Sequence, residues 1–308
     1  MTSRPSICVM GSFIVDLMMR APRLPLPGET IKGRVFKIGP GGKGSNQAVA
    51  ARRAGAETTI ITKIGKDQFT SLAIESFKKE GLATDLVFMD ENAATGAALI
   101  MVDEKSGQNS IVVTLGACGN LTAGEIDKAR EKIARAGVFL TQLETNLEVV
   151  EHAISIAHAS GVPVILNPAP ADTVPDAILA KVDYLTPNES EASALCGFPI
   201  ESIEDMQKAG KMLLAKGVKN VIFTIGKKGA YLYNDQVQRA FPPYDVQVVD
   251  TTGAGDAFNG GLAVAIAEKK PLEQAIQFAN AVASLKVTRV GTAPGMPTRD
   301  EIDKLLER

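Results

Sequence analysis

The sequence predicts an α/β protein with a doubly wound, mostly parallel central sheet, helices on both of its faces, and a second, smaller β-sheet. Three observations support this prediction. Short apolar runs alternate with amphipathic helical patterns through most of the 308 residues, as is typical of parallel sheets buried on both faces. Two stretches, 14–38 and 95–114, instead place strand after strand without a helix between them. The last third of the chain is mainly helical.

The expected strands of the main sheet are continuous apolar runs, at 7–10, 59–62, 138–143, 163–166, 182–185 and 221–225. Between these runs, apolar residues recur with the helical period. These helical patterns cover 47–54, 70–80, 123–135, 147–159 and 203–216, followed by 255–268, 272–287 and a short final segment at 299–307.

The small sheet is expected from 14–38 and 95–114. Asp103-Glu104-Lys105-Ser106-Gly107 has the composition of a hairpin turn between two apolar strands. A small sheet over the carboxyl edge of a larger one can act as a lid, and a decorative extension of the edge is the alternative. Because no repeat or linker divides the chain, we expect residues 1–308 to form a single domain.

Composition excludes several classes of function. With 45% hydrophobic residues, 22% charged residues and a formal net charge of -2, the chain is an ordinary globular protein that offers a polyanion no electrostatic attraction. We therefore expect no nucleic-acid partner. No apolar run approaches the roughly 20 residues of a membrane span, and the N-terminus lacks a signal-peptide layout. We expect no membrane partner and a cytoplasmic protein.

Polar residues follow the expected strands, where ligands of a doubly wound sheet bind. After the successive strands come Gly11, Ser12 and Asp16, then Glu144, Asn167, Asn188, Glu189, Glu191, Thr224 and Gly226, and finally 250–256. Carboxylates, amides and hydroxyls at one edge are what a polar small-molecule site requires.

The segment GPGGKGSNQAVAA, residues 39–51, is the first of two glycine-rich segments. It is not a Walker A loop, because Lys43 is followed by Gly44 rather than by Ser or Thr. A backbone with so few side chains lets a ligand come close. Lys43 and Asn46 stand at the start of the following helix, where they can hydrogen-bond hydroxyl groups. A flexible loop with no ligand is the alternative.

The segment VVDTTGAGDAFNGG, residues 248–261, combines an anion-binding backbone with a carboxylate. Successive N–H groups from Gly253, Ala254 and Gly255 at a helix N-terminus form a concavity for negative charge. Asp256 falls in the first turn of that helix, where a capping role is the plain structural alternative. Phosphoryl transfer to an alcohol explains both features: ionised Asp256 accepts the alcohol proton as general base, and the 253–256 backbone is the anion hole.

Together these two segments resemble the signature regions of the ribokinase-like carbohydrate kinases, the phosphofructokinase-B family. The resemblance extends through GETIKG, QLE, LNPAPA, TPNESEA and VTRVGTAPGMP. It implies a ribokinase-like fold with a β-sheet lid and ATP-dependent transfer to the 5-hydroxyl of a pentose, D-ribose or 2-deoxy-D-ribose. It also implies a cytoplasmic homodimer, formed through the lid sheets.

The resemblance assigns roles to individual positions. Asp256 matches the catalytic base, and Gly253, Ala254 and Gly255 match the anion hole. The sugar contacts match Asp16, Gly42, Lys43, Asn46 and Glu144. The nucleotide side matches Asn188, Thr224, Gly226, Gly229, Gly255 and Asn280, with Glu191 linked to Mg2+ and phosphate. A monovalent-cation site, usually for K+, would fall on Asp250, Thr252, Lys286, Arg289, Gly291 and Gly295.

One position departs from the pattern of similar ribokinases. They carry Asn where the stretch GSFIVD has Ile14, and an isoleucine cannot hydrogen-bond a sugar hydroxyl. A buried hydroxyl left without a partner costs about 1–3 kcal/mol, so Ile14 suits a sugar that lacks one hydroxyl. The alternative is that Ile14 only packs in the lid while ribose binds through Asp16, Lys43 and Asn46. Since an apolar contact excludes an added hydroxyl only weakly, we expect activity on both sugars.

Two rival functions stay open from the sequence. Another small-sugar kinase or a nucleoside kinase of the same superfamily is the enzymatic rival. A sugar-binding or regulatory protein without catalysis is the other, and the presence of Asp256 with its anion-hole segment argues against it.

Overall fold

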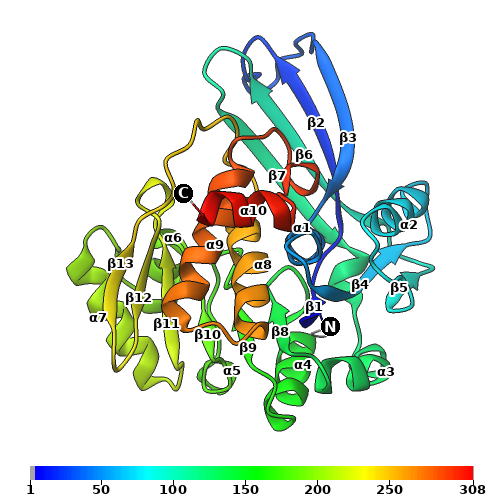
Figure 1. The fold of residues 1–308 in the computed structure, drawn as a ribbon. Coiled ribbons are helices and arrows are strands. Elements are labelled where there is room, and N and C mark those ends of the chain that lie inside the picture. Colours follow the sequence, from blue (N-terminus) through cyan, green and yellow to red (C-terminus); the bar gives the residue numbers. More distant parts are fainter. Residues whose placement is uncertain (1–3, 308) are drawn as a thin grey trace.

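A sheet of nine strands runs through the centre of the computed structural model, which describes residues 4–307 (Figure 1). The strand order is β13 (Gln238–Phe241), β12 (Ala230–Tyr233), β11 (Asn220–Thr224), β10 (Tyr184–Leu185), β9 (Val164–Leu166), β8 (Val138–Thr141), β1 (Ser6–Met10), β4 (Glu57–Gly65) and β5 (Val87–Asp90). Neighbours are parallel from β5 to β11, and β12 and β13 continue antiparallel. The expected mostly parallel sheet is confirmed.

Helices cover both faces of this sheet, as expected. One face packs against α1 (Lys43–Arg53), α2 (Thr70–Lys79), α8 (Ala254–Ala267), α9 (Leu272–Lys286) and α10 (Arg299–Leu306). The other face packs against α3 (Ala123–Ala134), α4 (Leu147–Ala159), α5 (Asp176–Leu179), α6 (Glu189–Cys196) and α7 (Ile203–Ala215). Strand β1 alternates between these two cores, because its successive side chains point to opposite faces: Ile7 and Val9 join the first, and Cys8 and Met10 the second.

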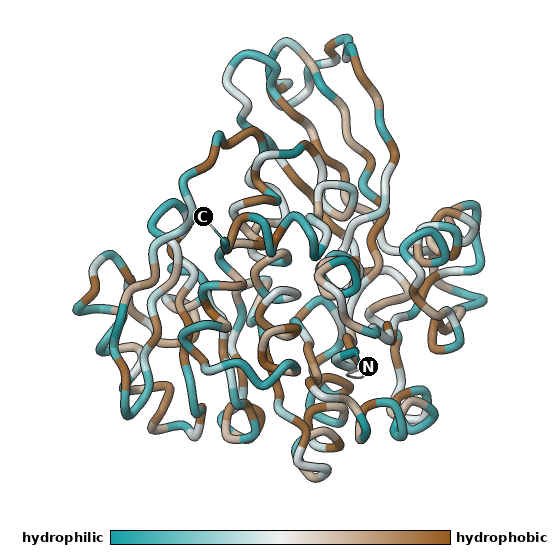
Figure 2. The backbone as a smooth tube through the Cα atoms, viewed as in Figure 1, coloured by the Kyte–Doolittle hydropathy of each residue, from teal (hydrophilic) through white to brown (hydrophobic). Residues whose placement is uncertain are grey.

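The second sheet has four strands and projects from the main body at the top of Figure 1. Its order is β3 (Val35–Gly41), β2 (Ile14–Ala21), β6 (Thr95–Asp103) and β7 (Asn109–Gly116). Strands β2 and β6 are parallel, and the two outer pairs are antiparallel. The hairpin expected at 103–107 joins β6 to β7 and is confirmed. Figure 2 shows hydrophobic segments along the strands of this sheet and hydrophilic turns at their outer ends.

Several short elements lie outside the expected pattern. The strands β5, β12 and β13 and the helices α5 and α6 are four to eight residues long, too short for a strong periodic signal. Helix α1 starts at Lys43 instead of residue 47. The added first turn packs closely on the chain after β1: a Cβ on Gly44 would lie 2.5 Å from the carbonyl carbon of Gly11.

Part of the expected single domain, residues 1–3 and 308, lies outside the described residues. Within 4–307, no helix combines the length and apolar character that a membrane span needs.

Candidate active site

The N-terminus of α8 presents backbone N–H groups and a buried carboxylate together. Gly253 is the N-cap and has φ 78°, a left-handed conformation that glycine adopts without strain. Asp256 lies in the first turn and is 7% exposed. The N–H of Ala254 donates to Thr251 O at 3.1 Å. Gly255 and Asp256 are the second and third helical residues, whose N–H groups have no partner within a helix.

Helix α1 supplies two amides that hold the Asp256 carboxylate. Asn46 Nδ2 donates to Oδ2 at 2.9 Å, and Gln47 Nε2 donates to Oδ1 at 3.0 Å. These contacts need α1 and α8 to pack closely, which small residues permit. A Cβ on Gly260 would lie 2.5 Å from Ala50 Cβ. The two glycine-rich segments, about 200 residues apart in the sequence, therefore meet at one carboxylate.

Gln47 and Gln142 are site residues that the sequence analysis missed. Gln47 Nε2 also donates to Asn167 Oδ1 at 3.0 Å, and Gln142 Nε2 donates to Gln47 Oε1 at 2.6 Å. Both glutamines are fully buried. For Gln47 the sequence did carry a signal, because this glutamine directly precedes the apolar run AVAA and is therefore expected to be buried. A buried polar side chain needs hydrogen-bond partners.

Asp16 and Glu144 are two of the residues that the resemblance assigns to sugar contacts. Glu144 Oε2 accepts from Lys43 N at 2.8 Å and from Ser12 Oγ. A Cβ on Gly41 would lie 2.4 Å from Asp16 Oδ1, so the carboxylate of Asp16 sits directly over a position that must be glycine. The predicted contact Gly42 caps α1 with φ 90°.

Burial and neighbouring carboxylates raise the pKa values of this cluster. Burial, then the charges of Glu144 and Asp256, raise the pKa of Asp16 to about 6. Burial raises the pKa of Asp256, and Lys43 and the two amides only partly oppose it. Burial lowers the pKa of Lys43, but Asp256, Glu144 and Glu191 outweigh it and leave that pKa raised. These mutual effects indicate that the charged side chains of Asp16, Lys43, Glu144 and Asp256 lie close together.

Ile14 lies on the same face of β2 as Asp16, because residues two apart in a strand share a face. Its side chain is 2% exposed. A Cβ on Gly96 of the neighbouring strand β6 would lie 2.4 Å from Ile14 Cδ1. Ile14 therefore packs tightly on the sheet face that carries Asp16.

The residues predicted for the nucleotide gather around the ends of β10 and β11. Asn188 caps α6, with Glu191 N donating to its Oδ1 at 2.8 Å, and Glu191 returns the contact by accepting from Asn188 N. Asn188 also pairs with Thr224 as an isolated bridge. Gly226 and Gly229 flank a short 3-10 turn after β11, with φ 53° and 89°.

Asn280 of α9 is 3% exposed. Its Nδ2 donates to Phe241 O at 3.0 Å and to Pro242 O at 3.2 Å. Its amide therefore holds the end of β13, beside the turn at Gly229. The role predicted for Asn280 beside adenine stays a prediction.

A lysine side chain bridges the two loops predicted to hold a monovalent cation. Lys286 is 0% exposed, and its Nζ donates to Asp250 O at 2.9 Å and to Arg289 O at 3.4 Å. Burial lowers the pKa of Lys286, against the charges of Asp250 and Asp256. The Asp250 carboxylate accepts from Thr252 N and Gly291 N, both at 2.9 Å.

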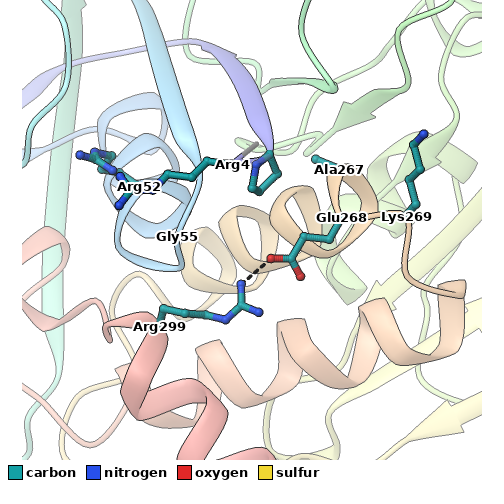
Figure 3. Close-up of a pocket in the computed structure, with 8 residues that line it drawn as sticks. Arg4, Arg52, Gly55, Ala267, Glu268, Lys269 and Arg299 are labelled. Carbon is teal, nitrogen blue, oxygen red and sulfur yellow. Dashed lines mark hydrogen bonds and ion pairs between the residues drawn. The ribbon is translucent and has the colours of Figure 1, made fainter. Parts of the chain in front are cut away.

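A separate hollow of about 860 Å³ lies at the opposite edge of the sheet (Figure 3). It is lined by Arg4, Pro5, Arg52, Gly55, Ala267, Glu268, Lys269 and Arg299. Pro5 directly precedes β1 and Gly55 lies shortly before β4, so this hollow is at the amino ends of the strands. The guanidinium of Arg299 donates hydrogen bonds to the carboxylates of Glu268 and Asp303. The hollow is not part of the cluster around Asp256.

Comparison with known proteins identifies the class to which this fold and site belong. A family model described as pfkB family carbohydrate kinase matches residues 4–299. The chain belongs to this family and is a kinase that phosphorylates a sugar.

The chain is similar to individual ribokinases and to deoxyribokinases within this family. The chain is 39% identical over 304 residues to a ribokinase of Haemophilus influenzae, with 99% of each chain covered. It is 37% identical over 301 residues to a deoxyribokinase of Salmonella typhi, covering 97% of this chain and 98% of that one. The structure of Arabidopsis thaliana ribokinase complexed with ribose and ATP has a TM-score of 0.90 at 34% identity, covering 99% of this chain and 100% of that one.

Proposed function

We propose that this kinase transfers the γ-phosphoryl group of ATP to the 5-hydroxyl of a pentose, D-ribose or 2-deoxy-D-ribose, with Asp256 as general base. One observation carries the proposal. Asn46 and Gln47 of α1 hold the Asp256 carboxylate, at the helix N-terminus that the anion hole requires. The base, the anion-binding backbone and the segment predicted to contact sugar therefore converge.

In the proposed reaction, the 5-hydroxyl gives its proton to Asp256 as its oxygen attacks the γ-phosphorus. The bond between that phosphorus and the β–γ bridging oxygen breaks, and ADP leaves. A raised pKa makes Asp256 a stronger base than an ordinary aspartate. The N–H groups of Gly253, Gly255 and Asp256 stabilise the charge on the transferring group. The N–H of Ala254 donates to Thr251 O instead, so Ala254 contributes to the anion hole by closing the turn that shapes it.

Sugar hydroxyls would bind at Asp16, Lys43, Asn46, Glu144 and the Gly42 backbone. Asn46 Oδ1 is buried and accepts no hydrogen bond from the described residues. A buried acceptor without a partner is costly, and a sugar hydroxyl can supply the missing donor. This orphaned oxygen supports a polyhydroxyl ligand beside Asp256.

ATP would lie along Asn188, Thr224, Gly226 and Gly229, with its phosphates toward Gly255. Mg2+ retains several waters and is commonly bound by one or two carboxylates together with substrate phosphates. The described residues contain no cluster of three or more metal-ligating side chains, and Glu191 is the acidic group at this end of the site. The residues here therefore fit Mg2+ that arrives bound to ATP. The ion would neutralise part of the charge on the ATP phosphates.

Ile14 is proposed to set the preference between the two sugars. Its side chain shares a strand face with Asp16 and packs on Gly96. A ribose hydroxyl against Ile14 would lose a hydrogen bond, whereas 2-deoxyribose has no hydroxyl to lose at its C2.

The testing experiment measures ADP release with Mg-ATP for D-ribose, 2-deoxy-D-ribose, fructose and adenosine. We expect turnover of both pentoses. Ile14→Asn should raise the ratio of kcat/KM for ribose to that for deoxyribose about tenfold, the effect of one buried hydrogen bond. An unchanged ratio would make Ile14 a packing residue only. Faster turnover of fructose or adenosine would overturn the pentose assignment.

Asp256→Asn tests the base assignment in the same assay. Loss of a general base should lower kcat by about 10²–10⁴-fold, while sugar binding measured by calorimetry persists. The matched control is Asp300→Asn, because Asp300 is an exposed acidic residue in the first turn of α10. Full turnover by the Asp256→Asn variant would remove Asp256 from the mechanism.

The small sheet is proposed to be a lid over the sugar and also a homodimer surface. Register and the period of two place Ile38, Leu99 and Val112 in one row on the face opposite Asp16, and Phe36 with Met19 and Met101 in the next row. All six are 39–67% exposed. A contiguous apolar face of this kind supports pairing with a second copy of the chain.

A further inference from the structure

Lys286, the last residue of α9, is a buried lysine, and among residues 4–307 no carboxylate is bonded to its ammonium. Its hydrogen-bond acceptors are two backbone carbonyls, Asp250 O at 2.9 Å and Arg289 O at 3.4 Å. Its side chain is 0% exposed. The two loops that it joins, 250–252 and 289–295, are those to which the family resemblance assigns a monovalent cation.

A free cation does not fit this arrangement. Backbone carbonyls satisfy a dehydrated monovalent cation by replacing its hydration shell, and the lysine ammonium already uses two of the carbonyls predicted for that purpose. An ammonium carries the same single positive charge and three donors. A second cation on the same carbonyls would face direct repulsion between like charges.

The surroundings leave space for the lysine stem. Gly295, another predicted cation ligand, has no side-chain oxygen to offer, and a Cβ there would lie 3.4 Å from Lys286 Cε. This distance is at the lower limit of ordinary van der Waals contact, so a Cβ at residue 295 would touch the lysine stem. The glycine and the lysine therefore complement each other.

We propose that the Lys286 ammonium permanently occupies the place that the family resemblance gives to a monovalent cation, so that this kinase orders its anion-hole loop without potassium. The connection to the anion hole is short. The carbonyl of Asp250 binds Lys286, and the carboxylate of the same residue accepts from Thr252 N, one residue before Gly253. Lys286 is thus a positioning residue for the N-terminus of α8.

The first test uses the wild-type protein. ADP release and the melting temperature are compared in KCl and in tetramethylammonium chloride at equal ionic strength. We expect both quantities to be the same in the two salts, with kcat/KM within about twofold. Activation of several-fold by K+, or a K+-specific rise in melting temperature, would overturn the proposal. The thermal measurement does not depend on which residue is the base or which sugar is phosphorylated.

The second test creates the missing cation site. Lys286→Ala removes the ammonium but leaves the carbonyls of Asp250 and Arg289. We expect a lower melting temperature and lower kcat in tetramethylammonium chloride, and recovery of both in KCl. Crystals soaked in thallium(I) should show an ion against the two carbonyls in this variant and none in the wild type. Thallium in the wild-type site would contradict the proposal.

Two further variants separate charge replacement from general destabilisation. Lys63 is also buried, and its Nζ donates to the carbonyl of Asn120 and pairs with Glu125, so Lys63→Ala is the matched control. It should lose stability without recovering it in KCl. Lys286→Met keeps an apolar stem in the space and should also show no recovery. Equal behaviour of the Lys286→Ala and Lys63→Ala proteins in the two salts would overturn the proposal.

Discussion

Asp256 illustrates how a buried carboxylate is held in one orientation by neighbouring amides. Burial alone favours the protonated form, and the charge of Lys43 with the amides of Asn46 and Gln47 offsets only part of that effect. The result is a carboxylate that is basic and oriented at once. A buried carboxylate held by specific hydrogen-bond donors is characteristic of functional sites. Burying such a group lowers the folding stability of the protein.

The cost of a buried carboxylate to folding stability should be measurable at Asp16. Its pKa is raised to about 6 from an ordinary value near 3.8, so the folded state binds the proton more tightly than the unfolded state. The protonated Asp16 carboxyl therefore contributes to folding stability below about pH 4, and this contribution is lost as pH rises through 6. Above pH 6 the ionised group costs about 2–3 kcal/mol.

We therefore expect Asp16→Asn to raise the melting temperature by several degrees at pH 7.5, with a gain that shrinks as pH falls from 6 to 4. Scanning calorimetry across this range measures the gain, and the variant should bind sugar more weakly. Asp235→Asn, at an exposed turn carboxylate, should give no comparable gain. A gain that stays constant with pH would contradict the assigned cause.

The element that decides the chemistry is the start of α8, and the element that positions it is α1. Gly253 turns the chain into the helix, and Gly260 lets α1 pack against it. Gly255 lies between them, and a Cβ on this residue would meet no neighbouring atom within 4 Å. Open space beside the anion hole is where the proposed phosphate lies.

Gly255→Ala should separate folding from function. Alanine in a helix is favoured over glycine by about 1 kcal/mol, so the melting temperature should stay the same or rise. The added methyl group would intrude on the transferring phosphoryl group, so kcat/KM should fall at least about tenfold. The two quantities are measured on the same preparation.

Gly124→Ala is the control for this substitution. Gly124 is likewise the second residue of its helix, α3, and a Cβ there also meets nothing within 4 Å. It should change stability in the same direction and leave turnover unaltered. An active Gly255→Ala protein would mean that the phosphoryl group does not pass beside Gly255.

At the scale of the whole molecule, one sheet positions the proposed active site and the other is proposed to cover it. The nine-stranded sheet brings the polar ends of its parallel strands to one edge, and the four-stranded sheet carries Asp16 and Ile14 to that edge on β2. The face of the small sheet opposite Asp16 stays apolar and exposed. That exposure is costly for a monomer and would be relieved by the proposed pairing.

Leu99→Asp tests the proposed dimer. Leu99 lies on the central strand β6 and is 55% exposed, so a charge there should prevent pairing and leave the fold intact. We expect a dimer for the wild type and a monomer for the variant in sedimentation velocity. Leu26→Asp, at a 69% exposed leucine outside the sheet, should remain a dimer. A monomeric wild type at micromolar concentration would refute this surface.

The sequence by itself determined the fold class, the second sheet and the position of Asp256 in the first turn of a helix. Each depends on local signals: hydrophobic period, turn residues and the spacing of glycines around a carboxylate. Five of the six residues of the predicted cation site lie in 250–252 and 289–295, and the sixth, Lys286, is the last residue of α9.

Only the tertiary structure decided which side chains complete the site. In the sequence, Gln47 and Gln142 are parts of a helix and of a strand end. In the structure Gln47 donates to Asp256, about 200 residues away, and Gln142 donates to Gln47, about 100 residues away. Lys286 belongs to the predicted cation site by its position in the sequence, and only the structure shows that its ammonium donates to the carbonyls of Asp250 and Arg289. Local pattern cannot reveal such contacts, because they arise from packing between helices that glycines allow to approach.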